Sequence, residues 1–405
     1  MNVLIISPGY PAEMAFFTRG LRDAGAGVIG LGDQAADALP ATARDALAHY
    51  VQVGSLAAGD QVAATVAELA ARVRIDRVEC LWEPCMVLAA RLREQLGRPG
   101  LTVAQTLPFR DKEQMKQLLD AAGLRTPWHV AAQSVAEVWA AAERAGYPLI
   151  VKPIDGAGSA DTYRADSAAD LDAILPSLRH LPRVSVEEFV DGHEFTYDTI
   201  CADGQVLFEN ICQYQPRPLM TKTHEWISPI TLALRDLDEP GLQGGRELGA
   251  AVLRALGFTD GFTHMEWYRK GDGEVVFGEI GARPPGARTV DVMNYATGAD
   301  LFAAWAQAVT QGRISQPIER RYNAASIFKR ARGAGRITRY EGLDRLLEEY
   351  AEHVVAVELL PVGAPRRDWR ATTIGDGMVI IRHADLPAAW EIAQRFAAEL
   401  HLYAS

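Results

Sequence analysis

The chain has 405 residues, enough for two to four domains with a large buried core. Its apolar fraction of 48% and charged fraction of 23% are those of an ordinary soluble protein, which excludes the fibrous and disordered classes. The formal net charge of -11 argues against a nucleic-acid groove, because phosphate backbones are bound by basic surfaces.

Cysteine content and the N-terminal sequence indicate a cellular compartment. No cysteine pair has zinc-ligand spacing, so we expect reduced thiols in or near the core at Cys80, Cys85, Cys201 and Cys212. The opening sequence MNVLIISPGY lacks the basic region and cleavage site of a signal peptide, and no uncharged apolar run is long enough to span a bilayer. We therefore expect a cytoplasmic protein that does not contact membranes.

The first hundred residues alternate short apolar strands with helices. Strands are predicted at residues 3–7, 27–32, 50–53 and 78–82, with a helix at about 12–24 after the first of them. Unbroken apolar strands alternating with helices predict a parallel sheet covered on both faces. The turn SPGYPAE after the first strand lacks the three-glycine spacing of a dinucleotide fingerprint, so we expect no such cofactor there.

A predicted helix at 111–122 ends at Gly123 and Pro127 and leads into a strand-and-helix region that extends to residue 190. The next section, to about residue 312, is larger and richer in strands. It includes a polar loop with several prolines at 213–229. A further small α/β piece follows residue 318.

The segment THMEWYRKGDGEVVFGEIGARPPG predicts a β-hairpin that carries two acids. Strand-like runs at 263–269 and 274–280 flank a turn signal, and Glu266 and Glu279 are thirteen positions apart. A two-residue loop would place the two glutamates directly opposite and a four-residue loop diagonally, but both registers keep them on one face. Two such carboxylates repel each other unless a cation lies between them, and hard oxygen ligands suit Mg²⁺. The alternative is a pair of solvated glutamates on an exposed face.

Arg283 follows Glu279 by four residues. A guanidinium at this place could hold a transferring phosphoryl group or an acyl phosphate, although a lone arginine is often only a surface charge.

Two further segments have residues suited to a nucleotide. In LIVKPIDGAGSADTYRA, Lys152 ends an apolar strand and a glycine-rich turn at 156–159 follows, which could offer backbone N–H groups to phosphates without having Walker spacing. In VSVEEFVDGHEFTYDTI, a strand ends at residues 187–190 and Glu194 follows. The backbone of that strand end could hold an adenine edge and Glu194 the ribose hydroxyls. Taken alone, each segment also fits an ordinary turn or an acidic strand end.

Together, and in the order FRDKEQM, IVKP, glycine-rich turn, EEFVDGHEF, HMEW and GEIGARPPG, these pieces resemble the ATP-grasp superfamily. The resemblance implies an α/β fold in which a Rossmann-like preATP-grasp domain is followed by a two-subdomain ATP-grasp module and a small C-terminal α/β cap. The implied boundaries are 1–108 for the first domain, 109–190 for the N-terminal part of the module with its lid, 191–318 for the C-terminal subdomain with the metal site, and 319–405 for the cap.

The resemblance also implies a role for individual residues. Lys112 and Lys152 match the lysines that contact the nucleotide phosphates, and the turn with Gly156, Gly158 and Ser159 matches the loop that closes over them. Glu266 and Glu279 match the Mg²⁺ ligands, where Mn²⁺ is an alternative ion, and Arg283 matches the arginine that stabilises the acyl phosphate. The adenine hinge and the ribose acid match Glu187, Glu188, Phe189, Val190 and Glu194.

The motif departs from many members in one position, because Gly281 stands where Asn is common two residues after the second metal-binding Glu. The departure leaves the number of metal ions open. The variant EIGARPPG, with its 13-then-4 spacing of Glu266, Glu279 and Arg283, resembles amino-acid ligases that make dipeptides and related amides. Biotin carboxylase and the purine-pathway ligases share the architecture, and GAGRIT near Arg336 is similar to their cap.

The implied activity is an ATP-dependent ligation of a small carboxylate to a small amine through an acyl phosphate, with release of ADP and phosphate. Lys222 and His224, in the loop at 213–229, are candidate reactive groups near the acceptor, and Arg288 is a candidate for binding a substrate carboxylate. The alternatives are a biotin carboxylase-like or purine-pathway ATP-grasp enzyme and a non-catalytic nucleotide-binding regulator. The sequence leaves the two substrates and the oligomeric state open, a homodimer being the commonest soluble assembly.

Overall fold

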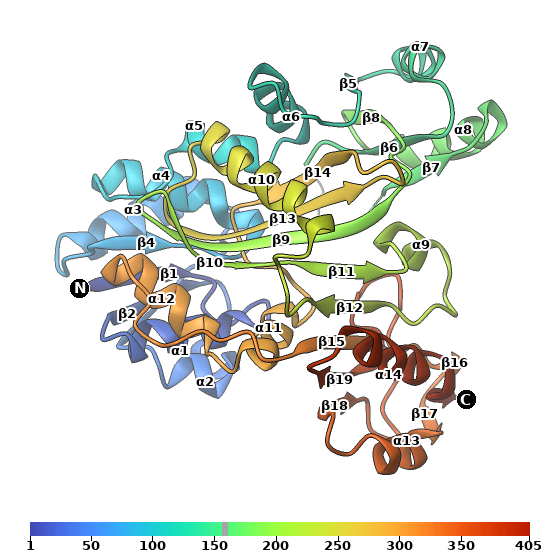
Figure 1. The fold of residues 1–405 in the computed structure, drawn as a ribbon. Helices are drawn as coiled ribbons and strands as arrows, with labels where there is room; N and C mark the ends of the chain where they lie inside the picture. Colours follow the sequence, from blue (N-terminus) through green and yellow to red (C-terminus); the bar gives the residue numbers. More distant parts are fainter. Residues whose placement is uncertain (156–160) are drawn as a thin grey trace.

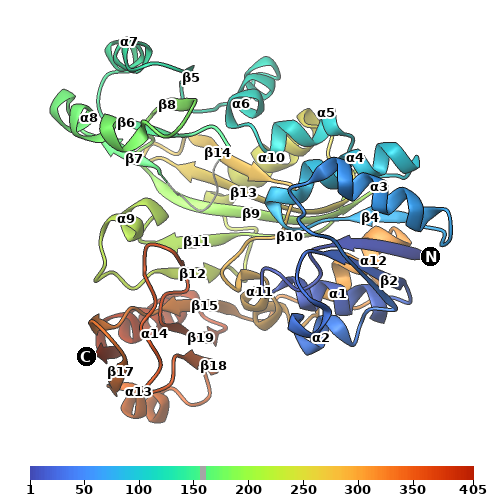
Figure 2. The same ribbon diagram turned by 180° about the vertical axis from the view of Figure 1, so that it is seen from behind.

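A computed structural model describes residues 1–155 and 161–405. Its described strands form four sheets, and a nine-stranded sheet lies at the centre of the molecule (Figure 1). An N-terminal α/β unit, a lid and a C-terminal cap surround this sheet, and the lid projects from the opposite side to the cap in both views (Figure 2). No helix in the described ranges is long and apolar enough to cross a membrane.

The N-terminal unit has the predicted parallel sheet. Its strands, in spatial order, are β3 (His49–Gln52), β2 (Gly27–Gly32), β1 (Asn2–Ile6) and β4 (Arg77–Glu79), and all pair in parallel. Helices cover both faces: α1 (Met14–Asp23), α2 (Ala41–Arg44), α3 (Gly59–Ala70) and α4 (Met86–Leu96), followed by α5 (Val103–Thr106). The fourth strand ends earlier than the predicted 78–82, because Glu83–Cys85 turn into a short 3-10 helix at the end of the sheet.

The lid region follows helix α6 (Lys112–Ala121), whose N-terminus is capped by Asp111 through the backbone N–H groups of Glu113 and Gln114. Its antiparallel sheet has the order β5 (His129–Ala132), β8 (Val184–Glu188), β6 (Leu149–Pro153) and β7 (Tyr163–Ala165). Helices α7 (Val135–Ala145) and α8 (Ala168–Ile174) pack against it.

The central sheet is antiparallel. Its strands are β14 (Val275–Gly281), β13 (Gly261–Arg269), β9 (His193–Ala202), β11 (Cys212–Gln215), β12 (Ile230–Ala233), β15 (Asn323–Phe328), β19 (Gly377–His383) and β18 (Val354–Leu359), with β10 (Gln205–Asn210) paired to β9. The loop predicted at 213–229 contains the end of β11 and helix α9 (Pro218–Thr223). Three longer helices pack near this sheet: α10 (Pro240–Ala255), α11 (Thr289–Thr297) and α12 (Leu301–Gln311).

The cap adds a three-stranded sheet of β16 (Arg332–Gly333), β20 (His401–Ala404) and β17 (Ile337–Glu341), with helices α13 (Leu343–Glu349) and α14 (Leu386–Glu399). Strand β15, which follows the predicted boundary at residue 318, pairs with β12, so the central sheet continues from residues 191–318 into the cap. This continuity brings residues of the cap close to the loop that contains α9.

Candidate active site

The hairpin β13–β14 places its two glutamates directly opposite each other. Glu266 pairs with Glu279, and His264 pairs with Gly281 in the same register. The hairpin loop has neither of the two predicted lengths. It has three residues, 271–273, and a hydrogen bond of 2.9 Å from the N–H of Lys270 to the carbonyl oxygen of Glu274 closes it. The direct register is restored by a shift between Glu266 and Trp267, which is a β-bulge with Gly278 as the extra residue.

Gly278 is required by the backbone at this bulge. A Cβ there would lie 2.8 Å from the carbonyl oxygen of Glu266, which is a backbone atom with little room to move. A glycine therefore allows the two strands to approach closely enough for the glutamates to face each other.

The two glutamates line a cavity of about 530 Å³ between the central sheet, the lid and the N-terminal unit. We define two parts of its lining. The charged wall consists of Lys112, Lys152, Glu187, Glu194, Glu266 and Glu279. The loop wall consists of Pro11, Glu13, Trp82, Glu83, Pro84, Pro284, Pro285 and Ala287.

In the charged wall, the buried carboxylate of Glu187 lies between two lysine side chains. Its Oε1 accepts from Nζ of Lys116 at 2.6 Å and its Oε2 lies 2.9 Å from Nζ of Lys152. Burial alone would raise the pKa of Glu187, but the two lysines hold it well below its ordinary value. Burial also lowers the pKa of Lys116, to about 8, against the attraction of Glu187. The carboxylate thus holds two lysine side chains, one from α6 and one from β6.

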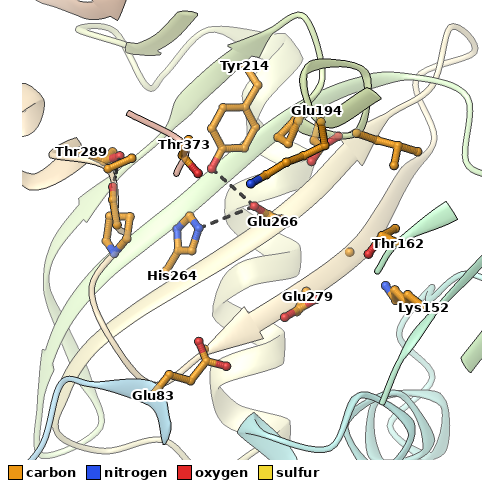
Figure 3. A pocket seen from close by; sticks show the side chains of 18 of the residues that line it. Glu83, Lys152, Thr162, Glu194, Tyr214, His264, Glu266, Glu279, Thr289 and Thr373 are labelled. Carbon is orange, nitrogen blue, oxygen red and sulfur yellow. Dashed lines mark hydrogen bonds and ion pairs between the residues drawn. The ribbon is translucent and has the colours of Figure 1, made fainter. Parts of the chain in front are cut away.

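The two hairpin acids also have cationic neighbours from the protein. Nζ of Lys112 lies 3.3 Å from Oε1 of Glu279. Nε2 of His264 lies 3.7 Å from Oε1 of Glu266, and Tyr214 donates its hydroxyl to the same oxygen at 3.4 Å (Figure 3). Each acid therefore has one cationic side chain close to it.

His264 is held from behind by a buried acid. Its Nδ1 lies 2.6 Å from Oδ1 of Asp198, whose other oxygen accepts from Thr196 and Asn210. Burial would lower the pKa of His264, but Asp198 and Glu266 raise it to about 9. The imidazole thus has a fixed orientation on the face that carries Glu266.

Arg283 reaches the cavity from the loop after β14 and is held by the N-terminal unit. Its Nε donates to Oε2 of Glu83 at 2.7 Å, although the two residues are 200 positions apart. Glu83 also pairs with Arg110. Burial would raise the pKa of Glu83, but Arg283 and Arg110 lower it, so this acid is a carboxylate shared by two guanidinium groups.

Glu194, near the hinge, is 5% exposed and pairs with Arg217, whose Nε lies 3.1 Å from its Oε2. Burial and repulsion by Glu266 raise the pKa of Glu194 to about 7, against the attraction of Arg217.

Comparison with known proteins agrees with this arrangement. Residues 109–215, which span α6, the lid and the start of the central sheet, match the ATP-grasp domain family. This part of the chain is therefore similar to an ATP-grasp domain. Lys112, Lys152, the hinge and Glu194 all lie within the matched residues, whereas the hairpin acids and Arg283 lie beyond them.

Two of the curated relatives that match parts of this chain are ligases. It is 30% identical over 215 residues to an L-arginine-specific L-amino acid ligase of Bacillus subtilis, with 51% of each chain covered. It is 38% identical over 108 residues to a D-alanine–D-alanine ligase of Ralstonia nicotianae, with 26% of this chain and 33% of that protein covered. The matches thus cover about half or less of these relatives' length.

The fold of the whole chain is shared with solved structures. The crystal structure of an L-amino acid ligase from Bacillus licheniformis superimposes with a TM-score of 0.79 at 21% identity, covering 100% of this chain and 98% of that one. An N5-carboxyaminoimidazole ribonucleotide synthetase from Thermotoga maritima gives 0.72 at 16% identity, covering 100% and 99%. The expected α/β architecture is thereby confirmed.

Most of the residues expected to form the site lie together in the cavity. The lining contains Lys112, Lys152, Glu187, Glu188, Phe189, Val190, Glu194, Lys222, Glu266, Glu279 and Arg283. Gly156, Gly158 and Ser159 lie outside the described residues. Arg288 is not part of the lining, since its guanidinium pairs with Asp291 and Glu358. Its proposed contact with a substrate carboxylate would require these pairs to open.

The sequence did not indicate the residues whose hydrogen bonds and ion pairs hold the predicted site residues in place. They include Lys116, Asp198, Tyr214, Arg217, His264 and Glu83. Only His264 was detectable in principle, because it lies two positions before Glu266 and therefore on the same face of the strand.

The donor set fits a Mg²⁺ ion that takes few protein ligands. Glu266 and Glu279 supply two facing carboxylates, and the described residues contain no group of three or more His, Cys, Asp and Glu placed to hold a metal. Gly281, opposite His264, contributes no side chain. Mg²⁺ usually completes its shell with water and substrate phosphates, so two carboxylates are sufficient.

Proposed function

We propose that this protein is an ATP-dependent carboxylate–amine ligase that forms an amide or peptide bond and releases ADP and phosphate. The observation that carries the proposal is the convergence of Glu266, Glu279 and Arg283 with Lys112 and Lys152 on one cavity. These residues come from four separate segments, and phosphoryl transfer needs this combination of positioning and charge neutralisation.

Each group has a distinct task in the proposed reaction. Lys112 and Lys152 hold phosphate oxygens of ATP, the backbone of residues 187–190 holds adenine, and Glu194 holds the ribose. Glu266 and Glu279 would hold Mg²⁺, or Mn²⁺ in its place. A bound ion would supply charge neutralisation for the transferring phosphoryl group.

The bond changes follow from these positions. A substrate carboxylate oxygen attacks the γ-phosphorus, and the bond from that phosphorus to the ADP oxygen breaks. The amine nitrogen then attacks the carbonyl carbon of the acyl phosphate, the carbon–oxygen bond to phosphate breaks, and the nitrogen loses a proton. Arg283, which Glu83 holds, would stabilise negative charge on the acyl oxygens.

Amino acids are the substrates we propose. Support comes from the EIGARPPG spacing and from the names of two relatives, an L-arginine-specific L-amino acid ligase and a D-alanine–D-alanine ligase. Lys222 lines the cavity and is our candidate reactive group on the acceptor side. Burial and the nearby Arg330 lower its pKa, which favours the uncharged amine.

The test is a screen of amino-acid pairs, arginine first, for release of ADP and phosphate, with mass spectrometry of the products. We expect ADP, phosphate and a condensed product in equal amounts. Release of AMP and pyrophosphate would overturn the acyl-phosphate mechanism.

Two alternatives predict other results in the same assay. A carboxylase of the biotin-dependent type would show ATP hydrolysis that depends on bicarbonate. A nucleotide-binding regulator would bind ATP without releasing ADP with any amino acid.

A further inference from the structure

Arg217 lies where the hinge, the ribose acid and helix α9 meet. It directly precedes α9 and lines the cavity, and its side chain is 18% exposed. Besides its ion pair with Glu194, its Nη1 donates to the carbonyl oxygen of Val190 at 2.8 Å. A single guanidinium thus links β9 to the strand end that is proposed to hold adenine.

Two aromatic rings fix the plane of this guanidinium. Its Cζ lies 4.9 Å from the centre of the Phe189 ring and 4.7 Å from that of Tyr268. Tyr268 is the direct strand partner of Glu194 in the β9–β13 pairing. Contacts with two rings and two hydrogen-bond acceptors leave the side chain few alternative positions.

Glu194 needs such a partner to keep one position. It is buried, and Glu266 repels it from the neighbouring strand. Among the residues described, Arg217 is the hydrogen-bond donor to this carboxylate, and it takes only Oε2. An acid that is held through one oxygen can offer the other to a ligand hydroxyl.

We propose that Arg217 is a positioning residue for ribose recognition: it orients Glu194 so that this acid accepts hydrogen bonds from the ribose hydroxyls of ATP. The inference rests on the proposed function, specifically on the ribose role of Glu194. Arg217 acts through Glu194 and needs no contact with the nucleotide.

The experiment compares binding of ATP and 2′,3′-dideoxy-ATP, measured by calorimetry without the other substrates. The wild-type protein is expected to bind ATP at least about tenfold more tightly, since a hydrogen bond to a charged group is worth about that factor. Arg217→Gln and Glu194→Ala are each expected to reduce this preference to about twofold or less. Arg217→Lys, which keeps the charge, is expected to retain most of it.

Arg164→Gln is the matched control. Arg164 also stacks on Phe189, with its Cζ 4.0 Å from the ring centre, but its Nε donates to Asp166 and not to Glu194. This variant is expected to keep the full ribose preference, because any loss of affinity should be equal for the two nucleotides.

The outcomes separate the inference from the function on which it rests. Equal weakening of both nucleotides by Arg217→Gln, with the preference intact, would overturn the inference, as would a wild-type protein without any preference. Failure of the wild-type protein to bind ATP at all would instead overturn the proposed function. If Arg217→Gln does not fold, Arg217→Met gives the same test, because it keeps an apolar side chain against Phe189 and Tyr268 but donates no hydrogen bond to Glu194.

Discussion

The charged wall and the loop wall of the cavity are built in different ways. In the charged wall, side chains stand on strands or on helix α6 and neutralise one another, as Glu187 does with Lys116 and Lys152. In the loop wall, prolines and glutamates come from the turn after β1, the turn after β4 and the loop after β14. The difference suggests that the charged wall serves the nucleotide chemistry, while the loop wall sets the choice of substrate.

The largest expected effect comes from removing a proposed metal ligand in the charged wall. Glu279→Gln should lower the turnover of ATP by at least about 100-fold, because charge stabilisation by a metal is worth several kcal/mol. The melting temperature should stay within a few degrees of the wild type, since this side chain is 29% exposed. ADP release is the assay, and turnover at the wild-type rate would contradict the metal assignment.

The next effect is on stability. Glu187→Gln leaves two buried lysines without their shared anion and should lower the free energy of unfolding by about 3 kcal/mol. Denaturant unfolding followed by circular dichroism measures it. Glu274→Gln is a control at the exposed tip of the hairpin and should change the free energy by under about 1 kcal/mol.

Glu187→Gln also tests how the free energy of unfolding depends on pH. The folded-state pKa of Glu187 lies well below its ordinary value of 4.5, so its contribution to stability is fully present above pH 4.5, declines as the pH falls below that value, and is lost only below the folded-state pKa. The difference in free energy of unfolding between the wild type and Glu187→Gln should therefore shrink between pH 6 and pH 3. A constant difference over that range would contradict the assignment of the low pKa to this ion pair.

A smaller effect is expected in the loop wall. Glu83→Gln weakens the hold on Arg283, and we expect kcat to fall by about tenfold while the Kd of ATP changes little. Glu79→Gln is a matched control, since Glu79 is a buried acid of β4 that pairs with Arg77. A loss of ATP affinity as large as the loss of kcat would place Glu83 in the nucleotide site.

The smallest effect should come from the cap. Arg330 donates to the carbonyl oxygens of Thr221 at 2.8 Å and His224 at 3.0 Å, and so holds the segment that carries Lys222. Arg330→Gln should raise the KM of the amine by a few-fold, about 1 kcal/mol, with kcat little changed. Arg382→Gln, which removes a stacking contact with Tyr322, should leave this KM unchanged.

The sequence was sufficient for the architecture and for the charged wall because both depend on local order. Strand periodicity places Glu266 and Glu279 on one face in either register, and the motif order identifies Lys112 and Lys152. The bulge at Gly278 was not predictable, since a hairpin pattern does not reveal which glycine is extra. Neither was the contact of Glu83 with Arg283, because it depends on how two units pack across 200 positions.

The contact between Glu83 and Arg283 also bears on recombination between related chains that share this fold. In a chimaera that takes its first 108 residues from another parent and the rest, with Arg283, from this chain, residue 83 decides whether the pair is kept. A hybrid that keeps a glutamate at position 83 should preserve the orientation of Arg283, whichever parent supplies the other residues of the loop wall. Libraries of hybrid enzymes would therefore gain active members if this one position were kept fixed.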